Sequence, residues 1–486
     1  MTVPEYSWSA VDEFRNRADD LAALETWWES QEQDPINMYG RRRVGKSWLF
    51  RRVAHGKPAV ILVAQEEATL ARSFAAFADQ IEPLLGVRPQ IDSISDLFTV
   101  LYRLAASEKV LVVVDEFPYL LGTSRPARTR SLTAIQAVLE RERDQSQIKL
   151  ILAGSLVAEM ERLQQPKSPL YGRLRAFDVQ PLSFPEAATM LAGVDPADDL
   201  TRYAVGGGMP RYLSAFGTGD MGRAVIANVL DRRGGLFNEP PALLHNELRS
   251  PATYFAILET LVGGARAIGD IAAESSMTSN ELTPYLENLK KMRLVERIIP
   301  AGASPKERKA LWRCSDHFVR FWFRFVWPFQ TELEAGADPA AYYKAYVQPE
   351  LASHAAPVFE AECARWVRRT YAGAVLSVGP WWGNALNAER RAKRRFTEEV
   401  DTVGLNRKRV RVALEAKWTR KPLSADVLTD LLTYKLPAMT QAGFDTTDTE
   451  IVLASRSGFT SAVTTLAEER DNVRLITAQE ILAVGT

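Results

Sequence analysis

Cysteine is scarce in this sequence, because its 486 residues include only Cys314 and Cys363. They lie far apart and outside any metal-ligand spacing, so we expect two reduced thiols. A net charge is lacking too, because 60 basic residues balance 60 acidic ones. No overall field therefore draws the protein to nucleic acid or to a membrane, and any such partner must meet a local patch.

Hydrophobic runs of membrane-spanning length are also lacking. The most apolar aromatic stretch, residues 318–329, is short and is interrupted by Arg320 and Arg324. Residues 1–25 are polar and charged, unlike a secretory signal. We therefore expect a cytoplasmic protein with no membrane partner. The length predicts two to four domains, and the apolar fraction of 46% is typical of a globular protein.

A phosphate-binding loop is the clearest feature that is present. The sequence "GRRRVGKS" begins at Gly40 and follows the pattern G-x-x-x-x-G-K-S. Gly40 and Gly45 let the backbone curl around phosphates. Lys46 adds a positive charge, and Ser47 can ligate Mg²⁺ at the start of a helix. A short strand is expected just before the loop, at residues 36–39. Further candidate ATP contacts are the other loop residues and the one that follows, namely Arg41, Arg42, Arg43, Val44 and Trp48.

An acidic pair follows a second strand. The apolar run at residues 109–120 predicts a parallel strand buried on both faces, and it carries Asp115 and Glu116 at its end. Ligands bind at that edge of open α/β sheets. Asp115 would support Mg²⁺, and Glu116 would polarise the attacking water. The alternative is a buried strand that ends in a polar turn.

Two further strands complete the first domain. The run at 148–155 ends in Ser155, which could contact the γ-phosphate or the water between the acidic groups. With another strand at 59–65, the series alternates β and α elements. This pattern predicts a doubly wound α/β ATPase domain with ATP and Mg²⁺ as cofactors.

Two arginines are candidates to sense or stabilise the γ-phosphate. Arg173 lies in "SPLYGRL" and could act as an arginine finger, either in cis or in trans within a homo-oligomer. Arg211 follows the turn-rich "VGGGMP". Either could instead be a surface arginine.

These motifs together resemble a known family. "FRNRADDLAAL", "MYGRRRVGKS", "VVVDEFPYL", "LAGS", "PLYGR", "GGGMPRYL" and "DHFVRFWFRFV" follow the order seen in archaeal-type P-loop ATPases, relatives of the AAA+ and STAND ATPases. The resemblance implies that Phe14 and Arg17 lie near the adenine. It also implies a P-loop core, a helical lid, a winged helix with a connecting helix, and a domain resembling the PD-(D/E)XK nucleases. We assign these parts to residues 1–180, 181–245, 246–330 and 345–486.

The middle segment supports that division by itself. Residues 251–312 predict three helices followed by two strands around a basic turn, the pattern of a winged helix-turn-helix. The exposed side of its third helix is mixed in charge, while the turn is suited to phosphates. DNA binding and a protein contact both remain open. The helix residues concerned are Glu281, Glu287, Lys290 and Lys291, and the turn residues are Lys306, Arg308 and Lys309.

A hairpin near the C-terminus carries the second candidate site. One strand ends in Asp401, and the next carries Glu415 and Lys417, which share a side because alternate strand residues point the same way. A helix predicted at 356–371 contributes Glu360. This order is that of a PD-(D/E)XK core, a restriction-endonuclease-like α/β domain. Asp401 and Glu415 would hold Mg²⁺ with Glu360 assisting, and Lys417 would orient the nucleophile or stabilise charge. The alternative is a solvated hairpin face.

Two functional hypotheses follow. The first is an ATP-regulated, Mg²⁺-dependent protein that cuts DNA. The second is a STAND-like signalling or scaffold ATPase whose C-terminal domain binds nucleic acid or protein without cutting. Basic residues at 391–395 and 407–411 could follow a phosphate backbone, and Tyr434 and Lys435 are possible backbone contacts.

Overall fold

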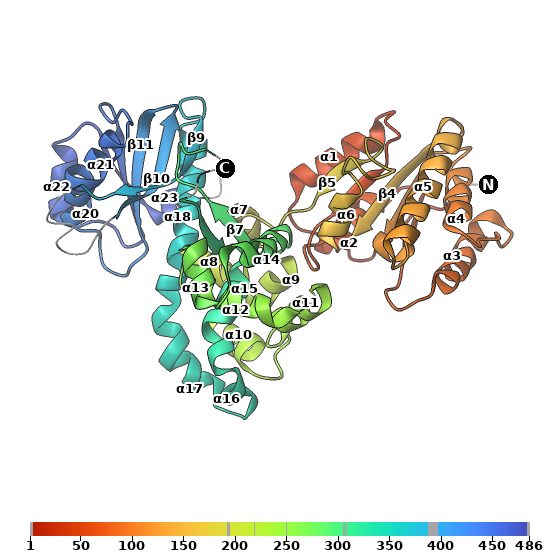
Figure 1. Ribbon diagram of the computed structural model, residues 1–486, viewed down its shortest axis with the longest axis horizontal. Helices are drawn as coiled ribbons and strands as arrows, with labels where there is room; N and C mark the ends of the chain where they lie inside the picture. Colours follow the sequence, from red (N-terminus) through yellow and green to blue (C-terminus); the bar gives the residue numbers. More distant parts are fainter. Residues whose placement is uncertain are drawn as a thin grey trace. The chain divides into compact units, whose positions relative to one another are not determined.

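The chain divides into two compact units (Figure 1). One comprises Met1–Leu182 with Met209–Arg211, and the other comprises Ser183–Gly208 with Tyr212–Thr486. Apart from residues 181–182 and Met209–Arg211, the residues assigned to the predicted lid, middle module and C-terminal domain lie within the second unit. The computed structural model describes residues 3–191, 195–217, 219–248, 250–304, 307, 309–386 and 397–483.

A five-stranded parallel sheet forms the centre of the first unit, in the order β2-β3-β4-β1-β5. This confirms the predicted α/β fold with a parallel sheet. Every residue of β3 and β4 is buried, as their continuous apolar sequences require. The strands are β1 (Ile36–Tyr39), β2 (Ala59–Val63), β3 (Val110–Asp115), β4 (Ile148–Gly154) and β5 (Arg175–Asp178).

Helices cover both faces of this sheet. On one face, Val112 of β3 belongs to a core that includes Phe98 and Ile135 from two helices. The alternate residues of β3, such as Val113, are equally buried but lie outside that core, and α2 contacts the strand. The helices are α1 (Ala18–Glu29), α2 (Lys46–Ala54), α3 (Leu70–Leu85), α4 (Ile94–Leu104), α5 (Arg125–Glu142) and α6 (Val157–Arg162).

The register of the sheet places the first residues of three loops, those that follow β1, β3 and β4, at one edge. Tyr39 at the end of β1 pairs with Gly154 at the end of β4, and β3 ends beside them in Asp115. Because the strands are parallel, the residues that follow each of them emerge at the same edge. The phosphate loop, Glu116 and Ser155 are placed together in this way.

The second unit begins with helices and a small antiparallel sheet in the order β6-β8-β7. The third helix of the predicted middle module is α14, which begins after a capping box formed by Thr278 and Glu281. The strands are β6 (Arg266–Ala267), β7 (Val295–Ile298) and β8 (Leu311–Cys314). The helices are α7 (Phe184–Ala188), α8 (Pro196–Gly206), α9 (Pro210–Phe216), α10 (Met221–Val225), α11 (Glu239–Glu247), α12 (Pro251–Leu261), α13 (Ile268–Glu274) and α14 (Ser279–Lys291).

The aromatic stretch near residue 320 forms α15 (His317–Phe325), a buried helix of the second unit. Trp322 Nε1 donates to Phe237 O at 2.6 Å, and the buried Arg320 donates to His354 O at 2.6 Å. Both charged and aromatic residues of this helix therefore serve packing. Among the described residues, no helix is long and apolar enough to cross a membrane. Short helices follow, α16 (Gln330–Glu334), α17 (Pro339–Tyr342) and a π-helical turn at Tyr343–Val347.

A mixed five-stranded sheet, in the order β13-β12-β11-β10-β9, completes the second unit. Its first three strands in sequence pair antiparallel, whereas β11, β12 and β13 run parallel. The strands are β9 (Ser377–Asn384), β10 (Thr397–Asn406), β11 (Arg409–Lys417), β12 (Glu450–Ser455) and β13 (Val473–Thr477). The helices are α18 (Leu351–Thr370), α20 (Ala425–Asp430), α21 (Leu436–Gln441), α22 (Ser461–Glu468) and α23 (Ala478–Leu482), with a π-helical turn, η8 (Leu431–Lys435), between α20 and α21.

Helices cover the two faces of this sheet as well. A methyl group at Gly404 of β10 would meet Val412 of β11 and Val367 of α18, so α18 lies on that face. Ala413, the next residue of β11, points the other way and shares a core with Leu431 and Met439 from the segment α20–η8–α21. The sheet thus lies between α18 and α20–η8–α21 (Figure 1).

Candidate functional site

Glycine is required at both ends of the phosphate loop. A side chain at Gly40 would collide with the carbonyl oxygen of Val179. Gly45 has a φ of 101°, in the region that only glycine adopts without strain, and α2 begins directly after it. The loop therefore curls tightly and delivers its chain to the N-terminus of α2, where anions bind favourably.

Lys46 lies inside this loop. It is 6% exposed, and its ammonium donates to the carbonyl oxygens of Gly40 and Arg41 at 2.7 and 3.2 Å. The loop backbone holds this positive charge at the helix N-terminus, where the phosphates of a nucleotide would bind. The expected role of Lys46 fits this placement.

Ser47 of α2 and Asp115 at the end of β3 contact each other through their side chains. Ser47 Oγ donates to Asp115 Oδ2 at 3.3 Å, and Asp115 Oδ1 accepts from the amide of Glu116 at 3.0 Å. Burial, followed by the charge of Glu116, raises the pKa of Asp115 above its usual value. A hydroxyl beside a carboxylate is an oxygen donor set that suits Mg²⁺, which also keeps water and phosphate ligands. The pair fits the predicted metal.

Glu116 is held by Ser155. Both carboxylate oxygens of Glu116 lie 2.8 Å from Ser155 Oγ, and Ser155 N donates to one of them at 3.3 Å. Glu116 also has a φ of 52°, which is uncommon for a residue with a side chain and marks local strain. The sequence suggested that Ser155 contacts the γ-phosphate or the water between the acidic groups. In the structure, its hydroxyl and amide contact the carboxylate of Glu116.

The remaining predicted loop contacts differ in exposure. Val44 and Arg41 are buried. Arg42 donates to Glu66 Oε2 at 3.2 Å and to the hydroxyl of Tyr119 at 3.3 Å, and Arg43 has a φ of 70°. Trp48 is 43% exposed and packs edge-on against another ring, with 5.0 Å between the centroids. That partner is Trp8, which also packs against Phe14.

Arg17 supports the phosphate loop, which the sequence did not reveal. Its guanidinium donates to Val44 O at 2.5 Å and to Gln180 O at 3.0 Å, and it pairs with Asp20 at 2.8 Å. Arg17 is 6% exposed and adopts a left-handed backbone conformation. The family resemblance suggested a contact with the adenine. In the structure, the side chain is hydrogen-bonded to the backbone of the loop at Val44.

Arg173 does not reach the phosphate loop within its own chain. It precedes β5, whose first residue pairs with Ile36 at the start of β1, whereas the phosphate loop follows the end of β1. Arg173 therefore lies at the opposite edge of the sheet, where it pairs with Glu140 at 2.6 Å. The predicted arginine finger in cis is wrong for this reason.

Arg211 is placed differently. The first unit includes Met209–Arg211, and a methyl group at Gly45 would lie 3.7 Å from Pro210 Cγ. The residue before Arg211 thus packs beside the phosphate loop. Arg211 stays a candidate to sense the nucleotide.

The second predicted site comes together on β10 and β11. Asp401 Oδ2 accepts from the amide of Ala416 at 2.8 Å. Lys417 Nζ lies 3.5 Å from Asp401 Oδ2 and 3.4 Å from Glu415 Oε2. An ammonium therefore stands between the two carboxylates, which shows that the space between them accommodates a cation.

Glu360 joins this group from α18. Burial, then the charges of Asp401 and Glu399, raise the pKa of Glu360 to about 8. The helix begins at Leu351, five residues before the predicted start at residue 356, and continues through Pro357. Glu360 is therefore in the middle of the helix, and the dipole of the helix N-terminus does not act on it.

Glu415 is the most buried carboxylate of the group, at 1% exposed. Burial, then the charge of Asp401, raise its pKa to about 7. In the described part of the chain, no group of three or more His, Cys, Asp or Glu side chains is disposed to hold a metal ion. A metal here would thus be held by Asp401 and Glu415 together with water, as Mg²⁺ commonly is.

Lys435 corrects another expectation. The sequence suggested that it contacts a nucleic-acid backbone, but it is 7% exposed and donates to Glu415 Oε1 at 2.5 Å. It lies in η8, on the face of the sheet opposite α18. Two lysines therefore contact Glu415, one at each carboxylate oxygen.

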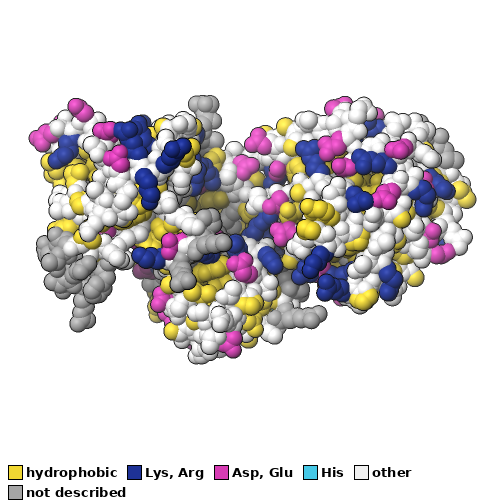
Figure 2. All heavy atoms as spheres, turned by 45° about the horizontal axis from the view of Figure 1, so that its top comes forward, with side chains coloured by type: hydrophobic (Ala, Val, Ile, Leu, Met, Phe, Trp, Pro, Cys, Tyr) yellow, Lys and Arg dark blue, Asp and Glu magenta, His cyan; other side chains and the backbone are white. Residues whose placement is uncertain are grey.

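The basic turn at Arg407 does not adjoin this group. The turn at Arg407 lies at the far end of the hairpin, and Arg409, the first residue of β11, is six residues and roughly 20 Å along the strand from Glu415. Arg409 there pairs with Asp448. Residues 391–395, and Lys306 and Arg308 of the middle segment, lie outside the described residues. On the face drawn in Figure 2, basic side chains are scattered among acidic and apolar ones.

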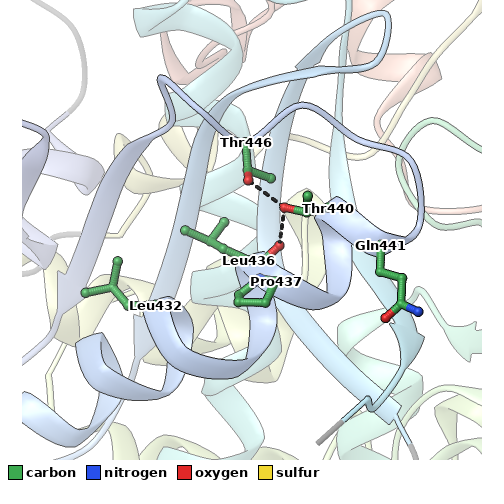
Figure 3. A pocket seen from close by; sticks show the side chains of 6 residues that line it. All are labelled: Leu432, Leu436, Pro437, Thr440, Gln441 and Thr446. Carbon is green, nitrogen blue, oxygen red and sulfur yellow. Dashed lines mark hydrogen bonds between the residues drawn. The ribbon is translucent and has the colours of Figure 1, made fainter.

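A surface hollow of about 470 Å³ lies elsewhere in the same domain (Figure 3). Its wall carries apolar, hydroxyl and amide groups but no titratable side chain, and Thr440 and Thr446 share a hydrogen bond of 2.7 Å there. It therefore has no group for acid, base or metal chemistry. Its residues are Leu432, Leu436, Pro437, Thr440, Gln441 and Thr446.

The parallel sheet, the glycine-bounded loop and the adjacent acidic pair define a P-loop ATPase domain. Residues 14–216 match a family described as an ATPase domain predominantly from Archaea. Residues 322–428 match a family described as archaeal and bacterial proteins of unknown function. The chain thus carries an archaeal-type P-loop ATPase domain followed by a domain of this second family.

Known proteins resemble most of the chain. An uncharacterized protein of Methanocaldococcus jannaschii is 26% identical over 416 residues, which are 83% of this chain and 87% of that protein. A Walker-type ATPase of Pyrococcus abyssi has a similar fold, with a TM-score of 0.52 and 22% identity over 67% of this chain and 100% of that one. The ORC2 protein of Aeropyrum pernix is more distant, with a TM-score of 0.43 and 15% identity over 69% of this chain and 96% of that one.

Proposed function

We propose that the first unit binds ATP with Mg²⁺ and hydrolyses it. Lys46 binds the β- and γ-phosphates, while Ser47 and Asp115 hold the metal. Glu116, oriented by Ser155, polarises the attacking water. The bound Mg²⁺ would neutralise charge on the phosphates. The observation that carries this proposal is the meeting of Ser47 with Asp115 at 3.3 Å beside the buried Lys46.

Phosphate release from ATP tests this part. We expect Mg²⁺-dependent turnover by the wild type and its loss in Asp115→Asn, which keeps the shape of the side chain but removes its charge. Asp144→Asn is the matched control, because Asp144 lies in a short helical turn after α5 rather than at the edge that holds the phosphate loop. Equal turnover in Asp115→Asn and wild type would contradict the assignment.

We further propose that the C-terminal domain is a metal-dependent nuclease that acts on DNA under nucleotide control. Asp401 and Glu415 hold Mg²⁺, Glu360 assists, and Lys417 orients the attacking water or stabilises charge on the phosphate. The metal would activate water and stabilise the pentacovalent phosphate. The placement of the Lys417 ammonium between the two carboxylates carries this proposal.

We also propose that the segment around α14 is a winged helix-turn-helix. Its three helices and antiparallel strands have the order that such a module requires. The outer side of α14 mixes charges, with Lys290 3.7 Å from Glu287. A contact with duplex DNA through this helix would therefore be weak. We retain the division at 1–180, 181–245, 246–330 and 345–486 as a proposal for the functional parts.

Cleavage of a panel of substrates tests the nuclease. Plasmid, duplex oligonucleotide, single-stranded DNA and RNA are incubated with Mg²⁺ or Mn²⁺, with and without ATP. We expect cleavage of DNA by the wild type and none by Lys417→Met, which retains the length of the side chain. Cleavage by Lys417→Met at the wild-type rate would remove the lysine from the mechanism.

A scaffold ATPase is the second candidate. The contact of Glu415 with a lysine at each oxygen favours it, because an ion-paired cluster can be purely structural. A scaffold would show no metal-dependent cleavage on any substrate, and its binding of nucleic acid would not depend on Asp401 or Glu415.

A further inference from the structure

Lys435 occupies an unusual place beside the proposed nuclease centre. It ends the π-helical turn η8 between two α-helical segments. Such turns are rare and often occur at functional sites. Here the turn brings a lysine ammonium to 2.5 Å from Glu415 Oε1, in a position where both side chains are almost fully buried.

The contacts of Glu415 give its two oxygens separate partners. Oε1 accepts from Lys435, whereas Oε2 faces Lys417, which also contacts Asp401. Because Oε1 accepts from Lys435 on the α20–η8–α21 face, Oε2 is the oxygen that shares the Lys417 ammonium with Asp401. This is the geometry that two carboxylates need in order to share one cation.

The charges of the centre agree with that arrangement. Glu360, Asp401 and Glu415 carry three negative charges when ionised, and the two lysines supply two positive ones. A divalent cation would offset the excess of negative charge among these five side chains. Without Lys435, that excess would be larger by one charge.

We infer that Lys435 is a positioning residue that holds Glu415 in place for the metal. This inference rests on the proposed nuclease function, and it assigns Lys435 no contact with substrate. Partners of metal-ligating carboxylates change metal affinity by about 10–100-fold when removed. A purely structural ion pair between helix and sheet would change stability but not the affinity for metal in the folded protein.

Direct binding of Mn²⁺ is the test. The full chain carrying Asp115→Asn is titrated with Mn²⁺ in the absence of nucleotide, and bound ion is measured by electron paramagnetic resonance. The additional change Asp401→Asn identifies which bound ion belongs to the nuclease centre. Lys435→Met is expected to weaken that ion's binding by about 10-fold or more, and Lys435→Arg is expected to restore most of it.

Two further variants serve as a control for the Mn²⁺ titration and as a replacement if Lys435→Met does not fold. Lys421→Met is the matched control, because Lys421 is an exposed lysine of the same domain, and it should bind Mn²⁺ as the wild type does. Lys435→Gln retains a donor of similar length, and it replaces Lys435→Met if that variant does not fold. Its expected affinity lies between those of the wild type and Lys435→Met.

The outcomes separate the two proposals. Wild-type Mn²⁺ affinity in folded Lys435→Met or Lys435→Gln would overturn the role of Lys435 and leave the nuclease proposal standing. Failure of Lys435→Arg to bind better than Lys435→Met would also overturn it. A wild type with no Asp401-dependent Mn²⁺ site would instead overturn the nuclease proposal itself.

Discussion

Ser155 Oγ lies 2.8 Å from both carboxylate oxygens of Glu116. The residue that follows β4 therefore holds the carboxylate that follows the neighbouring strand β3. The contact joins residues 39 positions apart in sequence. It restricts Glu116 to one orientation at the edge of the sheet where the phosphate loop lies. We therefore propose that Ser155 acts on hydrolysis through the carboxylate that it contacts.

We predict that Ser155→Ala lowers the turnover of ATP by up to ~100-fold, because a misplaced base loses much of its effect. The affinity for ATP should change little. Steady-state phosphate release and binding of a fluorescent nucleotide measure the two quantities. Ser155→Thr retains the hydroxyl and should recover part of the rate. Full turnover in Ser155→Ala would show that the contact has no role in hydrolysis.

Substitutions at Lys46 and Glu116 should separate the loss of nucleotide binding from the loss of ATP hydrolysis. Lys46→Ala is expected to abolish nucleotide binding, since its charge contacts the phosphates in the ground state. Glu116→Gln should bind ATP normally and lose at least ~100-fold in turnover, because Glu116 acts only when water attacks. Equilibrium binding and phosphate release distinguish them. An unchanged ATP affinity in Lys46→Ala would contradict the assignment of the loop.

Arg173→Ala should leave ATP turnover within about two-fold of wild type, because Arg173 lies at the opposite edge of the sheet and its exposed pair with Glu140 is screened by solvent. Phosphate release over a range of protein concentrations is the measurement. A large loss that is recovered on mixing with Glu116→Gln protein would instead show that Arg173 acts in trans.

The local parts of both sites could be predicted from the sequence. The spacing from Gly40 to Ser47 and the acidic end of the strand at Asp115 are contiguous patterns, and parallel strands bring such ends together. The pairing of Arg17 with Val44 and of Lys435 with Glu415 could not be predicted in this way. These pairs join different elements, and nothing in the spacing of the residues identifies the partner. The position of Arg173 was predicted wrongly because no strand was expected at residues 175–178, and this strand determines the edge at which Arg173 lies.

Protonation of His354 should destabilise the second unit. Burial, then the positive charge of Arg320, keep the pKa of His354 well below its usual value. A histidine with a lowered folded-state pKa contributes stability above its unfolded pKa of about 6.5, and this is lost as the pH falls below that value. Nε2 also lies 2.9 Å from Ala204 O, a contact that glutamine can replace.

The measurement is the free energy of unfolding of wild type and His354→Gln between pH 7.5 and 5. The variant should be less stable at pH 7.5, and the difference should shrink by ~2 kcal/mol at pH 5, at about 1.4 kcal/mol per pH unit. Only the difference is used, because burial raises the pKa of other groups, such as Glu362 to about 7, and these act in the opposite direction. A difference that is independent of pH would show that His354 does not titrate on unfolding.

The central claim is that Asp401 belongs to a metal-dependent nuclease centre. Its most direct test is cleavage of supercoiled plasmid in Mg²⁺ or Mn²⁺ by wild type, by Asp401→Ala and by Asp426→Ala, a change at an exposed acid of the same domain. We predict that wild type and Asp426→Ala cleave, that Asp401→Ala does not, and that all three hydrolyse ATP equally. Cleavage by Asp401→Ala at the wild-type rate, or none by the wild type on any substrate, would contradict the claim.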